Sequence, residues 1–178
     1  IWIPKGLWDE LGGFPEWFGS MAEDMYICCM ARLRGYTVEA LSRSGYNHLV
    51  GKTFGGGKIV QNTMKTTMRR RSLSERNKSY LMFVYYPSNI LYFIFPFHIL
   101  LLVLEGALLS MIKMNINIFQ NIYVYCLRSM WTERRRLILL RSKVQKNRVI
   151  SLKFLLSAHT LFPHKVCMAL KYGIPTID

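Results

Sequence analysis

The residues from 79 to 104 form a run without Asp, Glu, Lys or Arg, bounded by Lys78 and Glu105. The run is dense in aliphatic and aromatic side chains and is longer than the roughly 20 residues that a helix needs to cross a bilayer. Pro87 and Pro96 lie inside it and predict kinks. The remaining chain is too small to bury such a segment on all sides, so we expect it to associate with a membrane.

The overall charge agrees with a membrane protein that has basic flanks. The 178 residues carry a formal net charge of +14, yet 51% of them are hydrophobic. Disordered chains lack this combination of apolar and basic residues, whereas membrane-associated proteins often have it. A basic chain is also typical of nucleic-acid-binding proteins, and the uncharged run argues against that class.

Both flanks of the run are basic, and basic flanks tend to stay on the cytoplasmic side of a membrane. A single crossing would place one flank outside. A helical hairpin, a re-entrant segment bent at its prolines, or two crossings that include a weaker apolar stretch at 107–127 would keep both flanks inside, and we favour these over a single pass. The four cysteines show no Cys-x-x-Cys spacing, which favours reduced thiols and the cytoplasmic face.

The N-terminal part of the chain predicts short helices separated by loops, followed by a strand. The expected elements are a helix over 4–11, an aromatic loop over 14–19, a helix over 21–34 and a strand over 37–41. Gly12 and Gly13 supply the end of the first helix. Ser20 and Glu23 have the spacing of a capping box and predict the start of the second.

The order of features over 12–48, GGFPEWFGSMAEDMYICCMARLRGYTVEALSRSGYNH, resembles the acceptor-side half of family 2 (GT-A) glycosyltransferases. The resemblance covers roughly residues 1–55. It implies an α/β fold, namely the acceptor-side remnant of a Rossmann-like GT-A domain, followed by hydrophobic membrane helices and basic amphipathic helices. It also implies transfer of a sugar from a nucleotide donor to a hydroxyl acceptor, with inversion at the anomeric carbon.

The resemblance gives the acidic pair a catalytic role. In this family the second acid of such a pair takes the proton from the acceptor hydroxyl, and Asp24 aligns with that general base. A carboxylate at a helix N-terminus stays ionised, which suits a base. Glu23 would orient Asp24 or contact the acceptor. From spacing alone, both acids are ordinary first-turn residues of a helix.

Other positions acquire binding roles from the same resemblance. It implies that Gly13, Phe14, Trp17 and Phe18 line the acceptor pocket, with packing into the core as the alternative for the last two. It implies that His48 lies near the donor diphosphate or its metal ion, where an imidazole ligates or donates a hydrogen bond. An exposed loop position is the alternative for His48.

The donor side of such an enzyme has no counterpart in the sequence. The family holds a divalent metal, Mg or Mn, and the nucleotide diphosphate with an Asp-x-Asp motif in an N-terminal half, and no Asp-x-Asp occurs among these residues. No βαβ unit with a glycine-rich phosphate turn is indicated either. We therefore expect a C-terminal fragment that is inactive alone and depends on an upstream nucleotide-binding half.

The expected organisation has four regions. They are an acceptor-side glycosyltransferase part at 1–62, a basic juxtamembrane helix at 63–80, a hydrophobic membrane-associated region at 81–127 and a basic amphipathic region at 128–178. In the second region, four arginines are expected to contact lipid headgroups, at about 1 kcal/mol for each basic residue. They are Arg69, Arg70, Arg71 and Arg76.

The expected partners of the whole enzyme are a nucleotide sugar, a glycan or lipid-linked acceptor and membrane lipids, without nucleic acid. Two other functions stay open. The chain could be a non-catalytic basic membrane anchor or assembly protein. It could, less favourably, be a nucleic-acid-binding protein, which would be soluble and would bind RNA or DNA in a salt-sensitive way.

Overall fold

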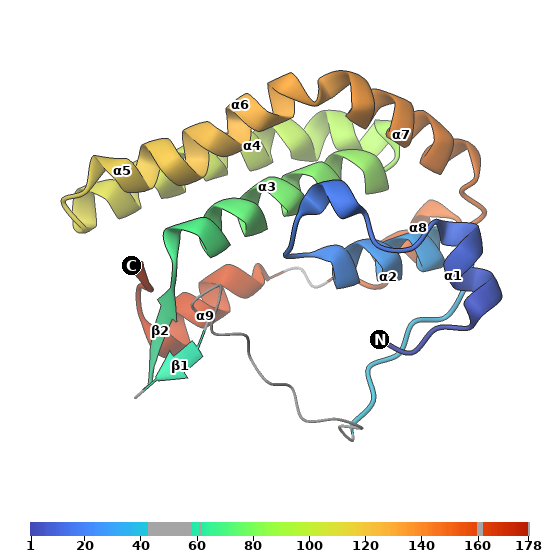
Figure 1. The fold of residues 1–178 in the computed structure, drawn as a ribbon, viewed down its shortest axis with the longest axis horizontal. Helices are drawn as coiled ribbons and strands as arrows, with labels where there is room; N and C mark the ends of the chain where they lie inside the picture. Colours follow the sequence, from blue (N-terminus) through green and yellow to red (C-terminus); the bar gives the residue numbers. More distant parts are fainter. Residues whose placement is uncertain (43–57, 61, 160–161, 178) are drawn as a thin grey trace.

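The computed structural model describes residues 1–42, 58–60, 62–159 and 162–177. Helices dominate the described part of the chain (Figure 1). In chain order they are α1 (Lys5–Leu11), η1 (Glu16–Phe18), α2 (Glu23–Leu33), α3 (Met68–Tyr85), α4 (Ser88–Ile112), α5 (Ile116–Ile118), the π-helix η3 (Phe119–Val124), α6 (Tyr125–Thr132), α7 (Arg134–Lys146), α8 (Leu152–Leu156) and α9 (His164–Tyr172).

The expected α/β fold is wrong. The strands described are short: β1 (Lys58–Val60), β2 (Thr63–Thr66) and β3 (Thr176–Ile177). They form one sheet in which β1 and β2 are antiparallel and β2 and β3 are parallel. The strand expected over 37–41 is not formed, because these residues are mostly exposed and pair with no strand in the described part of the chain. The arrangement is not that of a Rossmann-like remnant.

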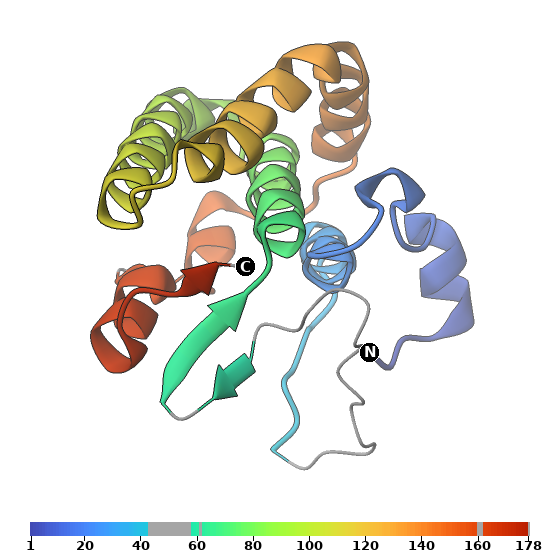
Figure 2. The ribbon, with the colours of Figure 1, turned by 60° about the vertical axis from the view of Figure 1, so that its left-hand side comes forward.

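Helix α3 lies at the centre of the larger core, as Figure 2 shows end-on. Its buried side chains include Tyr80, Leu81, Val84 and Tyr85, which pack with residues of α2, α7 and α8. The uncharged run therefore divides at Pro87. Its first part belongs to α3 and packs inside the protein, whereas its second part forms α4.

Helix α7 closes the end of α3. The Arg141 guanidinium donates hydrogen bonds of 2.6 Å to the carbonyl oxygens of Phe83 and Tyr86. The Gln145 amide donates to the two carbonyls between them, at 2.8 and 2.9 Å. The last carbonyls of a helix have no partner within it, so α7 supplies the donors that end α3 before Pro87.

A hairpin of α4 against α5, η3 and α6 forms the second core (Figure 1). A methyl group at Gly106 of α4 would meet the Tyr123 ring at 2.6 Å and the Phe119 ring at 2.8 Å, so the absence of a side chain allows this close approach. The weaker apolar stretch expected at 107–127 thus divides: its first residues complete α4, and the part from α5 onward packs back along that helix. Helix α4 continues through Pro96 and is the helix, among the described residues, that is long and apolar enough to cross a membrane.

Candidate functional site

The turn that leads into α2 has an unusual backbone. Met21 and Ala22 have φ angles of 71° and 65°, in the left-handed region that side-chain-bearing residues rarely adopt. Ala22 stands at the N-cap position, and no side chain caps the helix. The capping box expected from Ser20 and Glu23 is therefore not formed, and α2 begins at Glu23.

Asn77, from the middle of α3, holds this turn in place. Its buried amide nitrogen lies 2.7 Å from the Ser20 carbonyl oxygen, 2.8 Å from that of Met21 and 3.1 Å from that of Phe18. An amide has two N–H donors, so these three acceptors share them. One side chain thus binds three carbonyl oxygens within the four residues that form the turn.

Arg76 completes the attachment. Its guanidinium donates at 2.6 Å to the Phe18 carbonyl and at 2.9 Å to the Tyr125 hydroxyl. Its Nε also donates to the Asn77 side-chain oxygen at 2.9 Å, which fixes the orientation of the amide. We call Arg76 and Asn77 the turn clamp. Backbone strain of this kind costs about 1–3 kcal/mol per residue and persists only where surrounding contacts hold it.

The two acids differ in their surroundings. Asp24 is exposed, and its Oδ1 accepts a 2.7 Å hydrogen bond from the backbone nitrogen of Met25. One oxygen of Glu23, Oε2, is buried and has no hydrogen-bond partner within the described residues. The positive end of the α2 dipole favours negative charge here. The turn thus presents one carboxylate to solvent and places a second beside it.

The residues expected to line an acceptor pocket have different positions. Phe18 is 1% exposed and packs in the core, with its ring 5.5 Å from the Tyr26 ring. Trp17 is partly buried against Tyr80 and the Arg136 guanidinium. Phe14 keeps an exposed face and meets Trp8 edge-on at 4.8 Å.

Gly13 is buried against the same Trp8, whose ring a methyl group at Gly13 would meet at 3.0 Å. Of the four expected acceptor residues, Phe14 is the one whose ring is well exposed. His48 lies outside the described residues.

The four arginines expected at the membrane surface do not act together. Arg76 belongs to the turn clamp, and Arg71 pairs with Glu75 and Glu105. Arg69 is exposed at the start of α3, and Arg70 is partly buried nearby. The sequence showed that these four residues are basic, but it did not show that Arg71 and Arg76 bind groups within the protein.

A partly buried charge cluster, in which Glu75 is the buried member, links α3, α4 and α9. Lys165 donates to Glu75 at 2.7 Å and to Glu105 at 2.8 Å, and Arg71 contacts both carboxylates. Burial alone would raise the pKa of Glu75, but the Lys165 ammonium and the Arg71 guanidinium together lower it below its usual range. The cluster joins the C-terminal helix α9 to the α3–α4 pair.

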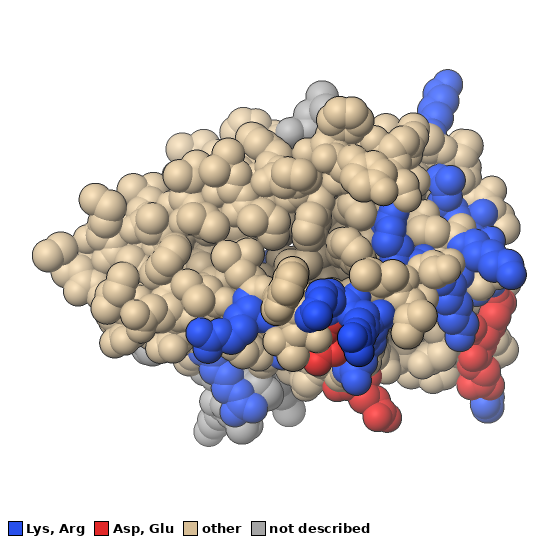
Figure 3. Space-filling model, turned by 90° about the horizontal axis from the view of Figure 1, so that it is seen from above, with Lys and Arg blue, Asp and Glu red and all other residues tan. Residues whose placement is uncertain are grey.

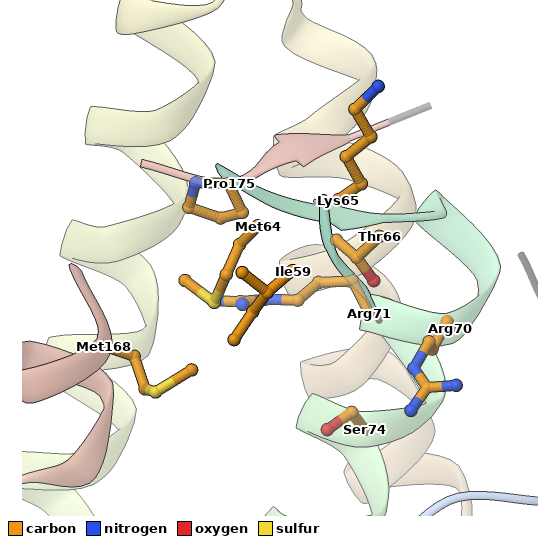
Figure 4. A pocket seen from close by; sticks show the side chains of 9 residues that line it. All are labelled: Ile59, Met64, Lys65, Thr66, Arg70, Arg71, Ser74, Met168 and Pro175. Atoms are coloured by element: carbon orange, nitrogen blue, oxygen red, sulfur yellow. The ribbon is translucent and has the colours of Figure 1, made fainter. Parts of the chain in front are cut away.

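A hollow of about 250 Å³ lies beside this cluster, between the sheet, the start of α3 and α9 (Figure 4). Met64, Met168 and Pro175 give it an apolar wall, and Arg70 and Arg71 lie at its margin. Glu23 and Asp24 do not line this hollow. The described part of the chain contains no group of three His, Cys, Asp or Glu side chains placed to hold a metal ion. The resemblance places the Mg or Mn site in an upstream half.

Comparison of the chain with protein-family models, with curated proteins and with solved structures finds no match.

Sequence reasoning missed the turn clamp. A signal for it exists, because Asn77 falls on the stripe of α3 that continues with Tyr80, Leu81 and Val84, all buried. An amide on a buried stripe needs hydrogen-bond partners. The sequence does not say which backbone segment supplies them.

Proposed function

We propose that the turn ahead of α2 carries the general base of a membrane-associated inverting glycosyltransferase, with Asp24 as that base. The observation that carries the proposal is the positive φ of Met21 and Ala22, fixed by Asn77 directly before the acidic pair. Strained backbone held by surrounding contacts is concentrated at catalytic and ligand-binding positions. A turn with no functional demand could have adopted the capping-box geometry that its sequence favours.

In the proposed reaction an acceptor hydroxyl oxygen attacks the anomeric carbon of a nucleotide sugar. The new carbon–oxygen bond forms on the face opposite the diphosphate, the bond to the diphosphate oxygen breaks with its electron pair, and the configuration inverts. Asp24 takes the hydroxyl proton as the oxygen becomes bonded. Because Asp24 is exposed in the first turn of α2, its carboxylate is accessible to an acceptor.

Glu23 has a positioning role in this proposal. Its Oε2 is buried without a hydrogen-bond donor among the described residues. A neighbouring hydroxyl of a sugar acceptor would supply that donor, since an ionised carboxylate only accepts. Hydrogen bonding to Glu23 would set the acceptor so that a second hydroxyl faces Asp24.

The donor nucleotide and its metal ion are assigned to another part of the enzyme. The acceptor class follows from the membrane-associated helix α4. A lipid-linked glycan would present its hydroxyl close to the bilayer, where an enzyme held by α4 can reach it.

The test uses the natural full-length enzyme in its own membranes. These are incubated with a panel of uridine, guanosine and thymidine diphosphate sugars, and release of the nucleoside diphosphate is measured with the endogenous lipid-linked acceptors present. The variant Asp24→Asn should lose transfer by about 100-fold or more, the contribution of a general base, while nucleotide-sugar binding is retained. Asp9→Asn, at an exposed acid of α1 paired with Lys5, makes the same chemical change away from the turn and should leave transfer unchanged.

A non-catalytic membrane anchor is the second candidate, and the exposed apolar surface of α4 favours it. If the protein is an anchor, membranes that contain the Asp24→Asn variant should transfer sugar at the wild-type rate from every donor tested. Such a result would remove the catalytic proposal and leave the anchor.

A further inference from the structure

Helix α4 exposes one continuous apolar stripe. Phe93, Phe97, Leu101, Leu104 and Leu108 recur at helical spacing, and Phe93 is 80% exposed. Leu100 widens the stripe at its middle, and Tyr92, Met111 and Ile112 extend it toward the two ends. Isolated apolar residues on a surface are ordinary, but a stripe along a whole helix indicates a partner.

The middle of the opposite side of α4 is covered by α3, and its C-terminal part packs against α5 and η3. The contacts run from the Phe83–Phe95 ring pair at 5.5 Å, through the 2.8 Å hydrogen bond of Ser79 with His98, to the Arg71–Glu105 ion pair. Residue numbers rise in one helix as they fall in the other, so α3 and α4 are antiparallel neighbours. Any movement of α4 into a membrane therefore carries α3 with it.

Helix α3 has the wrong composition for a bilayer interior. It contains Arg69, Arg70, Arg71, Glu75, Arg76 and Lys78 within its first three turns. A charged side chain at the bilayer centre costs about 2.5–3.5 kcal/mol even on insertion scales. If α4 crossed the membrane, the charged half of α3 would be drawn in beside it.

Charge on the surface points to the same orientation. Figure 3, which looks down on α4, α5 and α6, shows the left tip and upper left of this face free of charge, with Lys and Arg gathered at the end where α7 lies and further Lys and Arg along the lower edge. Arg128, Arg134, Arg135 and Arg136 are exposed there. Trp131 is 70% exposed with the Arg134 guanidinium 4.4 Å from its ring. Tryptophan and arginine side by side are typical of the headgroup region.

We infer that α4 lies parallel to the plane of an anionic bilayer, with its apolar stripe in one leaflet, the α6–α7 arginines on the headgroups and α3 on the side of α4 away from the bilayer. The helix therefore does not cross the membrane, although its length would allow it. Anionic lipid is the partner because the basic side chains would meet its headgroups, each worth about 1 kcal/mol near the surface. This inference does not depend on the proposed catalytic activity.

The depth of spin labels along α4 tests the orientation. The full chain is bound to vesicles of phosphatidylcholine and phosphatidylglycerol mixed at about two to one, with labels at Phe93→Cys, Leu101→Cys and Met111→Cys. Cys167, the exposed native cysteine, is replaced by serine, and the signal of this parent variant is subtracted. A label at Arg69→Cys on α3 serves as the control.

An in-plane helix predicts similar depths for the three α4 labels, within the 5–10 Å that interfacial helices reach, and a water-exposed label at 69. A crossing helix predicts labels at 93 and 111 separated by about 27 Å along the membrane normal, with the middle label deepest, which would overturn the inference.

Vesicle flotation provides the second measurement. Binding should fall at least tenfold on vesicles of phosphatidylcholine alone and also in the double variant Phe93→Ser/Phe97→Ser. Leu170→Ser, at an exposed leucine of α9, is the matched control and should bind like the parent. Equal binding by the double variant, or a stable dimer in solution with no affinity for either vesicle, would show that the stripe serves another partner and would refute the inference.

Discussion

The side-chain nitrogen of Asn77 lies 2.8 Å from the carbonyl oxygen of Met21, two residues before Glu23. This contact joins the middle of the central helix to the most strained part of the backbone. It makes the geometry of the acidic pair depend on a residue more than fifty positions later in the chain.

Replacement of Asn77 by alanine should release the turn. A buried carbonyl oxygen that loses its only hydrogen-bond donor lowers stability by about 1–3 kcal/mol. We therefore expect the free energy of unfolding to fall by about 2 kcal/mol. Amide hydrogen exchange should accelerate over 18–24 before it changes elsewhere. The control is Asn147→Ala, which removes an exposed amide bonded to the Lys143 carbonyl and should change stability little. Equal effects of the two variants would mean that the clamp does not hold the turn.

Ala22→Gly should stabilise the protein, contrary to the usual effect of glycine. The φ of 65° at Ala22 costs an alanine about 1 kcal/mol relative to glycine, and glycine is also accepted at an N-cap. We expect a gain of about 0.5 kcal/mol after the extra freedom of the unfolded chain is included. Ala31→Gly, in the interior of α2, should instead lose about 1 kcal/mol. Urea unfolding of both variants measures the difference, and losses of similar size would contradict the strained turn.

The structure shows which parts of the sequence pattern were informative. The helices expected at 4–11 and 21–34 correspond to α1 and α2, because glycines and periodic apolar residues act locally. The strand expected at 37–41 failed because strand formation requires a pairing partner, which the local pattern does not contain. The capping box of Ser20 and Glu23 failed for a related reason, since contacts from α3 override a local preference.

The uncharged run was an informative but incomplete signal. Its composition predicted one membrane segment, yet the chain reverses at Pro87 and buries Tyr80 and Val84 in the core. Composition alone cannot distinguish apolar residues that face lipid from apolar residues that pack against other helices of the protein. Likewise, the sequence identified Arg71 and Arg76 as basic without indicating that Glu105 and the Phe18 carbonyl would bind them.

The charge cluster around the buried Glu75 predicts a pH dependence of stability. Because Arg71 and Lys165 lower the pKa of Glu75 in the folded protein, its ionised form contributes stability above the ordinary carboxylate pKa. That contribution is lost as the pH falls through the depressed pKa, since the unfolded chain then binds the proton first. The free energy of unfolding should therefore decline below about pH 4.3, the ordinary value for glutamate.

Glu75→Gln should reduce this decline and lower stability by about 1–2 kcal/mol at pH 7, because the partly buried Arg71 and the more exposed Lys165 then have Glu105 alone as their acidic partner. Glu39→Gln, at an exposed position outside the cluster, should change neither quantity. Urea unfolding at pH 7 and pH 4 gives both. A decline that is as steep in Glu75→Gln as in the parent would assign the acid sensitivity to other carboxylates.

The helical hairpin depends on the lack of a side chain at residue 106. A methyl group there would meet the Tyr123 ring at 2.6 Å, and both rings that line the contact are packed into the second core. Overpacking of this kind costs about 1–3 kcal/mol, so Gly106→Ala should lower the melting temperature even though alanine favours helix more than glycine does. Gly6→Ala, in α1 with open space around it, should raise the melting temperature slightly through the same helix preference.

If α4 binds the membrane in the plane with η3 and α6 attached, Gly106→Ala should also weaken vesicle binding. Separation of the hairpin would rotate part of the apolar stripe away from the lipid. A Gly106→Ala variant that melts and binds like the parent would mean that α4 and η3 are not packed at this distance.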